Sequence, residues 1–147
     1  MKLEDKFDFD TALEVDNEVW KVFPKIQARE IKTMLKAKEG IEDLKHCLTT
    51  GFELKGFVFT VENVDKNKGF DIVITSCPWH TMIAKSHRAH LSAKVGDTIC
   101  RTEYSTWAAE FGDNIIFAFD TQKRICAGGQ ECVLHFTTKS NAKRRQA

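Results

Sequence analysis

Four of the five cysteines lie in the second half of the chain, where their spacing indicates one shared site. Cys77 directly precedes Pro78, Cys100 follows further along, and Cys126 and Cys132 bracket a short segment that contains two glycines. Each of these cysteines falls at the predicted end or edge of a helix or strand, where its side chain can point into a common pocket. The pattern predicts a thiolate site that serves a metal ion, an iron–sulfur cluster or a reaction.

Two of these cysteines are expected at the N-termini of helices. Cys77 ends a predicted strand before a helix that starts at Pro78, and Cys100 lies in the first turn of a helix predicted to start at Gly96 with Asp97 as its cap. Free backbone N–H groups and the positive end of the helix dipole stabilise a thiolate there. A low pKa is therefore expected at both positions, with Cys77 the better nucleophile. The alternative for each is a small buried hydrophobic side chain.

The last two cysteines are expected to approach each other. The glycines between Cys126 and Cys132 allow a tight turn, and Cys132 shares a strand face with Leu134 and Phe136, so it points inward if that face meets the helices. The spacing is not the C-x2-C of zinc ribbons, so the spacing alone is a weak indication of zinc. The binding hypothesis is that the four cysteines hold zinc or an iron–sulfur cluster. Cys47, on a different predicted helix, is interpreted as structural.

Four further residues are candidates for the chemistry. Glu103 lies one helical turn after Cys100 and could move a proton or orient a ligand, and His80 is the best-placed histidine for proton transfer or metal ligation. Arg88 could hold an anionic substrate. Trp107 lies four residues after Glu103 on the same side of the helix and is a candidate for substrate contact. The alternative for Glu103 and Trp107 is a core stripe with a polar edge.

Composition limits the classes of protein to consider. The chain has 147 residues, of which 42% are hydrophobic and 29% charged, with a net charge of +1, so we expect one domain and no dedicated nucleic-acid binding. No apolar run approaches the ~20 residues of a membrane span, and the N-terminus does not resemble a signal peptide. The chain is therefore expected to be cytoplasmic, where spaced cysteines are more often metal-binding or catalytic than disulfide-bonded.

The periodicity predicts an α+β fold. Helices are expected from Asp10 or Thr11, from Pro24 to about Gly40, and from Ile41 to Gly51, followed by strand–strand–helix–helix–strand–strand. The strands are predicted at 57–62, 70–75, 114–120 and 131–138, in a four-stranded antiparallel sheet with helices mainly on one face. Residues 10–138 form the predicted domain, between a flexible N-terminus (1–9) and a basic, flexible tail (139–147).

One geometric condition must hold for a single cysteine site. A straight helix from Pro78 to residue 94 would separate Cys77 from Cys100 by ~25 Å. The helix must therefore stop near Arg88 or His90, and the chain must double back before Gly96.

These motifs resemble a known family. Cys77-Pro78-Trp79, Cys100 with Glu103, and the Cys126–Cys132 pair followed by Phe136 are similar to the L-2-amino-thiazoline-4-carboxylic acid hydrolase-like family and its uncharacterised bacterial and archaeal relatives. The similarity extends over roughly residues 12–138 and includes the N-terminal segments 18–20 and 40–44. A more distant similarity is to vinyl-reductase-type small-molecule-binding domains, which also end in a glycine flanked by cysteines and a strand.

The two resemblances imply different functions. The hydrolase-like family implies that water opens a small cyclic carbon–nitrogen compound such as an aminothiazoline carboxylate, with catalysis by Cys77, His80 and Glu103. The vinyl-reductase-type domains imply a binding or sensing domain, in some members with a bound zinc. The expected partner is a small molecule, with no nucleic acid and no membrane. A homodimer is also compatible with the sequence, because apolar residues occupy more than one side of the N-terminal helices (Val15, Val19, Trp20, Val22 and Phe23).

Overall fold

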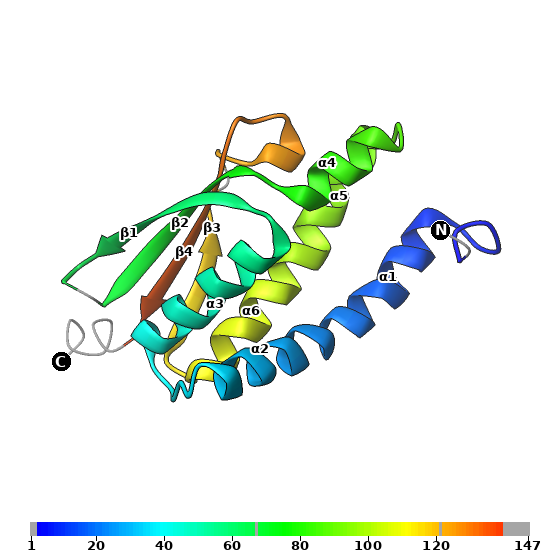
Figure 1. Cartoon of the computed structure of the whole chain (residues 1–147). Coiled ribbons are helices and arrows are strands. Elements are labelled where there is room, and N and C mark those ends of the chain that lie inside the picture. The colour runs from blue at the N-terminus through cyan, green and yellow to red at the C-terminus, as the bar shows by residue number, and fades with distance from the viewer. Residues whose placement is uncertain (1–2, 67, 121, 140–147) are drawn as a thin grey trace.

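A four-stranded antiparallel sheet forms one layer of the computed structural model, and the helices cover one of its faces (Figure 1). The structure describes residues 3–66, 68–120 and 122–139. The strands are β1 (Val58–Val64), β2 (Gly69–Ser76), β3 (Ile115–Phe119) and β4 (Cys132–Thr138), in the order β1-β2-β4-β3. The predicted α+β class and the order of strands and helices are confirmed. Of the predicted basic tail, residues 140–147 lie outside the described residues.

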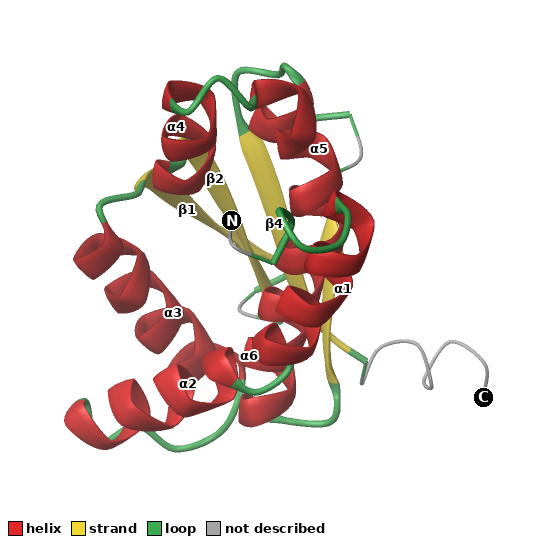
Figure 2. Cartoon of the chain, turned by 90° about the vertical axis from the view of Figure 1, so that its right-hand side faces the viewer, coloured by secondary structure: helices red, strands yellow, loops and turns green. Residues whose placement is uncertain are grey.

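The N-terminal half supplies three helices, α1 (Phe9–Trp20), α2 (Phe23–Met34) and α3 (Ile41–Lys55). Asp8 caps α1 by accepting a hydrogen bond from the Thr11 backbone N–H at 2.7 Å, so the predicted cap at Asp10 or Thr11 is two or three residues late. The segment between β2 and β3 forms α4 (Pro78–Lys85), α5 (Ser92–Val95) and α6 (Arg101–Phe111). Turned by 90°, the molecule presents these helices in front of the strands (Figure 2).

Helix α3 does not end at Gly51, contrary to the sequence prediction. A side chain at Gly51 would come within 3.3 Å of Ile31, so this glycine allows α3 to pack closely against α2 instead of ending the helix. The helix ends at Gly56, which adopts the left-handed conformation with φ of 82°. Glycine at a helix contact and glycine at a helix end are indistinguishable in one sequence.

The predicted helix start at Gly96 and Asp97 is also wrong. A single-turn π-helix at Gly96–Cys100 joins α5 to α6, so one helical path runs from Ser92 to Phe111. Cys100 therefore lies inside a helix and not in its first turn. The side chain of Asp97 pairs with Arg124 and does not cap a helix. Such π-turns change the direction in which the following side chains point, and they are frequent at functional sites.

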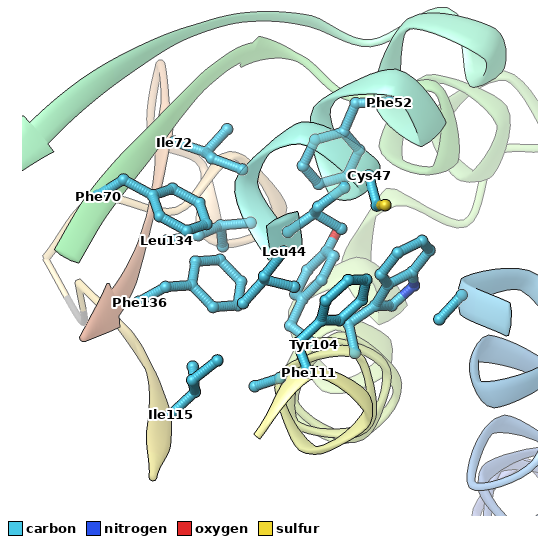
Figure 3. Close-up of a cluster of buried hydrophobic side chains, with 14 of the residues drawn as sticks. Leu44, Cys47, Phe52, Phe70, Ile72, Tyr104, Phe111, Ile115, Leu134 and Phe136 are labelled. Atoms are coloured by element: carbon cyan, nitrogen blue, oxygen red, sulfur yellow. The ribbon is translucent and has the colours of Figure 1, made fainter. Parts of the chain in front are cut away.

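The core fills the space between the sheet and the helices (Figure 3). Phe70 and Ile72 of β2 alternate with outward-facing residues, and Leu134 and Phe136 continue the same inner face on β4. Helices α3 and α6 cover this face with large side chains that are at most 3% exposed (Leu44, Leu48, Phe52, Tyr104, Trp107 and Phe111). Cys47 is completely buried in this cluster, as its structural interpretation requires.

Candidate functional site

Cys77, Cys100, Cys126 and Cys132 line one small cavity of about 50 Å³, which we call the cysteine cavity. They come from four different segments: the start of α4, the π-turn, the 3-10 turn Ile125–Ala127, and the first residue of β4. The rest of the wall is mainly apolar and aromatic (Phe57, Ile74, Trp79, Ile83, Val95, Tyr104, Phe119, Ile125 and Leu134), with His80, Ser92 and Arg124 as polar members. The predicted constellation is therefore assembled as one site.

The chain between Cys77 and Cys100 doubles back as a single site requires. Helix α4 ends at Lys85, and His87 adopts a left-handed conformation with φ of 59° that reverses the chain direction. A 3-10 turn at Ala89–Leu91 then leads into α5. The turn returns the chain along α4, and Cys100 reaches the cavity that Cys77 already lines.

The loop between β3 and β4 brings the other two cysteines to the same place. Its 3-10 turn is capped by Gly128 with φ of 92°, and the Gly129 N–H donates to the carbonyl of Arg124 at 2.9 Å. The backbone N–H of Ile125 donates to the sulfur of Cys132 at 3.1 Å. N–H donors of this kind stabilise a sulfur that carries negative charge.

Gly96 allows the loop to approach the helix closely. A methyl group at Gly96 would lie 2.7 Å from the sulfur of Cys126 and 2.9 Å from a terminal nitrogen of Arg124. Only glycine fits between the π-turn and these two side chains without displacing one of them.

Burial controls the ionisation of the cavity thiols. It raises the pKa of Cys77, and this effect exceeds the opposite effect of the backbone N–H groups of His80 and Trp79 at the start of α4. The pKa of Cys100 is raised well above its ordinary value by burial of the sulfur, then by Glu103 and the neighbouring thiols. The expectation of a low pKa at Cys77 and Cys100 is therefore wrong, because packing removes the water that would stabilise the charged thiolate.

The pKa of the Cys126 thiol follows the same balance. Burial raises this pKa, and the guanidinium of Arg124 acts in the opposite direction. Without a bound cation, these three thiols therefore hold their protons at neutral pH. Whatever binds them as thiolates must displace those protons.

Arg124 is a wall residue that the sequence analysis did not single out. It is 9% exposed, stacks over the ring of Phe119 with 4.4 Å to the ring centroid, and pairs with Asp97 from the π-turn. Its Nε is buried without a hydrogen-bond partner among the described residues. A lone arginine in a polar loop normally faces solvent, so the residue type gave no reason to place Arg124 in the site. Its position two residues before Cys126 was the one indication in the sequence that it could line the cavity.

His80 lies in the cavity wall, as its candidate role requires. Its Nδ1 is hydrogen-bonded to the hydroxyl of Ser92 at 2.7 Å, and Ser92 is 2% exposed. This contact fixes the ring beside Cys77 and ties α4 to α5. Tyr104 also lines the cavity from α6, where burial raises the pKa of its hydroxyl well above the ordinary value.

The other three candidate residues lie outside the cavity wall. Glu103 is 2% exposed and pairs with Lys55 of α3 at 3.3 Å. Trp107 is a core residue with 1% exposure and does not line the cysteine cavity, so its core alternative is the one that the packing supports. Arg88 is paired with Glu4 at 2.6 Å. It lines a neighbouring hollow of about 270 Å³ that shares only part of its wall with the cysteine cavity.

Glu103→Gln is expected to make the fold less sensitive to pH. Burial raises the pKa of Glu103 above its ordinary value of 4.5, and Lys55 only partly opposes this effect. The folded chain then holds this proton more tightly than the unfolded chain, so stability falls as pH rises from 4.5 through the raised pKa. Urea unfolding at a series of pH values should give a stability advantage of the variant that grows as pH increases.

The matched control for this measurement is Glu62→Gln, because Glu62 on β1 is exposed to solvent. This control should follow the pH dependence of the wild type. If Glu103→Gln loses stability relative to the wild type as pH rises, the ion pair with Lys55 outweighs the burial of the carboxylate.

The donor set suits a soft metal ion, although the side chains are not arranged around one point. Four thiols in one cavity are the ligands that zinc and iron prefer over magnesium and calcium. Among the described residues, no group of three or more His, Cys, Asp or Glu side chains is arranged to hold a metal ion. The thiols would therefore have to rotate toward the centre of the cavity to bind one.

Comparison with known proteins gives a family and no activity. A family model described as "Family of unknown function (DUF6125)" matches residues 1–130. The matched segment contains Cys77, Cys100 and Cys126 and stops before Cys132. No curated protein matches the chain. Within the described residues, the structure has no helix with the length and apolar character needed to cross a membrane.

Proposed function

Because the chain belongs to the family of unknown function DUF6125, whose description names no activity, we propose from the geometry of the cysteine cavity that the protein is a zinc-binding domain. Cys77, Cys100, Cys126 and Cys132 are the proposed ligands. The observation that carries the proposal is that four cysteines from four separate segments line one cavity of about 50 Å³. Four partly buried cysteines that merely fill space have no physical reason to meet.

The size of the cavity favours a single ion. A tetrahedral zinc site has Zn–S distances of about 2.3 Å and therefore needs sulfurs about 3.8 Å apart. A volume of about 50 Å³ holds only a few water-sized groups, which suits one ion better than a four-iron cluster or a ring that carries a carboxylate. To bind one ion, the four cysteine side chains would have to turn their sulfurs toward the centre of the cavity.

The surroundings of the sulfurs support the same proposal. Zinc would displace the protons that Cys77, Cys100 and Cys126 otherwise retain, so its affinity should rise with pH. The Ile125 N–H supports the sulfur of Cys132, and Arg124 lies beside Cys126 and would offset part of the negative charge of four thiolates. A site of four cysteines leaves no open position on zinc, which favours a structural or sensing role.

The second candidate function is a hydrolase that opens a small cyclic carbon–nitrogen compound, for which Cys77 would be the nucleophile. One observation favours it: His80 lies in the same cavity wall as Cys77, and a hollow of about 270 Å³ with Arg88 in its wall adjoins them. Two observations count against it: the raised pKa of Cys77 keeps the thiol protonated, and Arg88 is already paired with Glu4. It remains a prediction.

Metal analysis of protein purified anaerobically without an affinity tag tests the proposal. We expect about one zinc per chain, an ultraviolet–visible spectrum without charge-transfer bands above about 350 nm, and four thiols that react only after chelation. If the protein instead contains iron and absorbs visible light, the four cysteines hold an iron–sulfur cluster and the zinc proposal is wrong. A metal-free protein in which one cysteine alkylates far faster than the others would contradict the proposal and support the hydrolase.

A further inference from the structure

The N-terminal helices carry a stripe of exposed apolar side chains. Val15, Val19, Val22 and Ile26 are 44%, 55%, 54% and 49% exposed, and they follow one another at intervals of four, three and four residues. Phe23, beside them, is 45% exposed. Within one helix this is the spacing of the a and d positions of a coiled coil, whose side chains pack against a second helix. Here it spans the turn at Lys21 and Val22 that joins α1 to α2.

The stripe lies opposite the buried face of α2 and borders the buried face of α1. Ala12, Leu13, Pro24 and Ala28 are the buried residues of α1 and α2. At 100° per residue, Ile26 lies about 160° around α2 from both Pro24 and Ala28. On α1, Val15 and Val19 lie more than 100° from Leu13 but only about 60° and about 20° from Ala12. Two apolar faces on one helical segment mean that the second face is not explained by the fold of one chain.

The two helices form one bent rod at the edge of the molecule. Helix α2 begins directly after the turn that ends α1 and continues away from it (Figure 1). The stripe spans about 16 Å of this rod at 1.5 Å per residue. No other element of the described chain lies over these five residues closely enough to bury them.

The charges beside the stripe are self-complementary. Glu18 and Lys25 flank it seven residues apart, with Glu18 toward its N-terminal end and Lys25 toward its C-terminal end. Glu18 also pairs with Lys21 of its own chain at 2.5 Å, a contact that it would share with Lys25 of the other copy. If two copies pair antiparallel about a two-fold axis near Trp20 and Lys21, Val15 of one copy packs near Ile26 of the other. Glu18 then faces Lys25 of the other copy, and symmetry repeats the contact.

We propose that the occupant of this stripe is a second copy of the same chain, paired antiparallel through α1 and α2. The proposal is independent of the metal site, because none of the stripe residues lines the cysteine cavity. The patch is smaller than most obligate interfaces, so the dimer should dissociate on dilution, with a Kd on the order of 10 µM.

Sedimentation velocity from about 1 to 200 µM, a range that brackets this Kd, measures the equilibrium. Glu18→Lys and Lys25→Glu should each raise the Kd about tenfold, because each places two like-charged pairs across the axis. The double variant, which exchanges both charges, should dimerise within about threefold of the wild type. An equimolar mixture of the two single variants should form heterodimers, in which both contacts join opposite charges.

The mixture separates a lost contact from a misfolded chain, because neither single variant could be rescued by the other if it were unfolded. Leu54→Glu on α3 is the matched surface control: Leu54 is 72% exposed but lies outside the stripe, so dimerisation should not change. A wild-type chain that stays monomeric at about 200 µM would overturn the proposal. So would charge variants that dimerise like the wild type, because a parallel pair or another surface would not bring Glu18 to Lys25.

Discussion

Cys100→Ser is expected to reduce the bound zinc from about one ion per chain to less than about one tenth, with zinc affinity lowered about 100-fold or more. Cys100 is the cysteine whose sulfur burial disfavours ionisation most strongly, and it enters the cavity from the π-turn. A serine hydroxyl holds its proton at neutral pH and cannot replace a thiolate ligand. Metal analysis and competition with a chromophoric zinc chelator measure the loss.

Cys47→Ser is the matched control for this variant. Cys47 is completely buried, whereas the cavity cysteines are partly buried, and it belongs to the hydrophobic core and does not line the cysteine cavity. The control should lose stability because a hydroxyl replaces a sulfur in the core, while it keeps its zinc. Equal zinc loss in both variants would mean that unfolding releases the metal. Full zinc in Cys100→Ser would remove Cys100 from the ligand set.

Trp107→Ala is expected to lower the free energy of unfolding by about 3–5 kcal/mol. Trp107 is 1% exposed, stacks on Phe111 with 6.3 Å between ring centroids, and packs against α3 at Gly51. Its removal would leave a cavity where α2, α3 and α6 meet. Urea unfolding measures the change, and metal content in the absence of urea should stay that of the wild type, because the indole does not line the cysteine cavity.

Trp79→Ala provides the contrast for the core tryptophan. Trp79 is 37% exposed and makes an edge contact with Trp20 at 5.9 Å, so its loss should destabilise the fold by only about 1–2 kcal/mol. Because Trp79 lies in the wall of the cysteine cavity, its removal should instead open the site to water and speed the reaction of chelators. If the two substitutions destabilise the chain equally, Trp107 does not have the core role assigned to it.

The sheet could be predicted from the sequence because its signal is local. Phe70, Ile72, Leu134 and Phe136 alternate with polar residues, and every second side chain on a strand faces the core. The same rule correctly placed Cys132 on the inner face. The start of α4 was equally readable, because Pro78 favours the first turn of a helix and Cys77 is its N-cap residue.

The rest of the site depends on contacts between distant segments, which one sequence does not reveal. Gly96 suggested a helix start, but its small size is needed where Cys126 and Arg124 press against the π-turn. Trp107 and Glu103 share a helical stripe with Cys100, and the π-turn together with the packing of α3 decides that they face the core. The rise in the thiol pKa values also came from packing, which local arguments about helix ends could not include.

The position of β4 links completion of the sheet to completion of the cysteine cavity. β4 is the last strand that the structure describes along the chain, but it lies between β2 and β3 in the sheet, and its first residue is Cys132. During synthesis from the N-terminus, β3 therefore has no neighbour, and the cavity lacks its fourth sulfur, until β4 has left the ribosome. A nascent chain that stops before Cys132 would expose the inner edge of β2, which invites pairing with other chains. The strand that completes the cysteine cavity is therefore also the one that covers the open edges of β2 and β3.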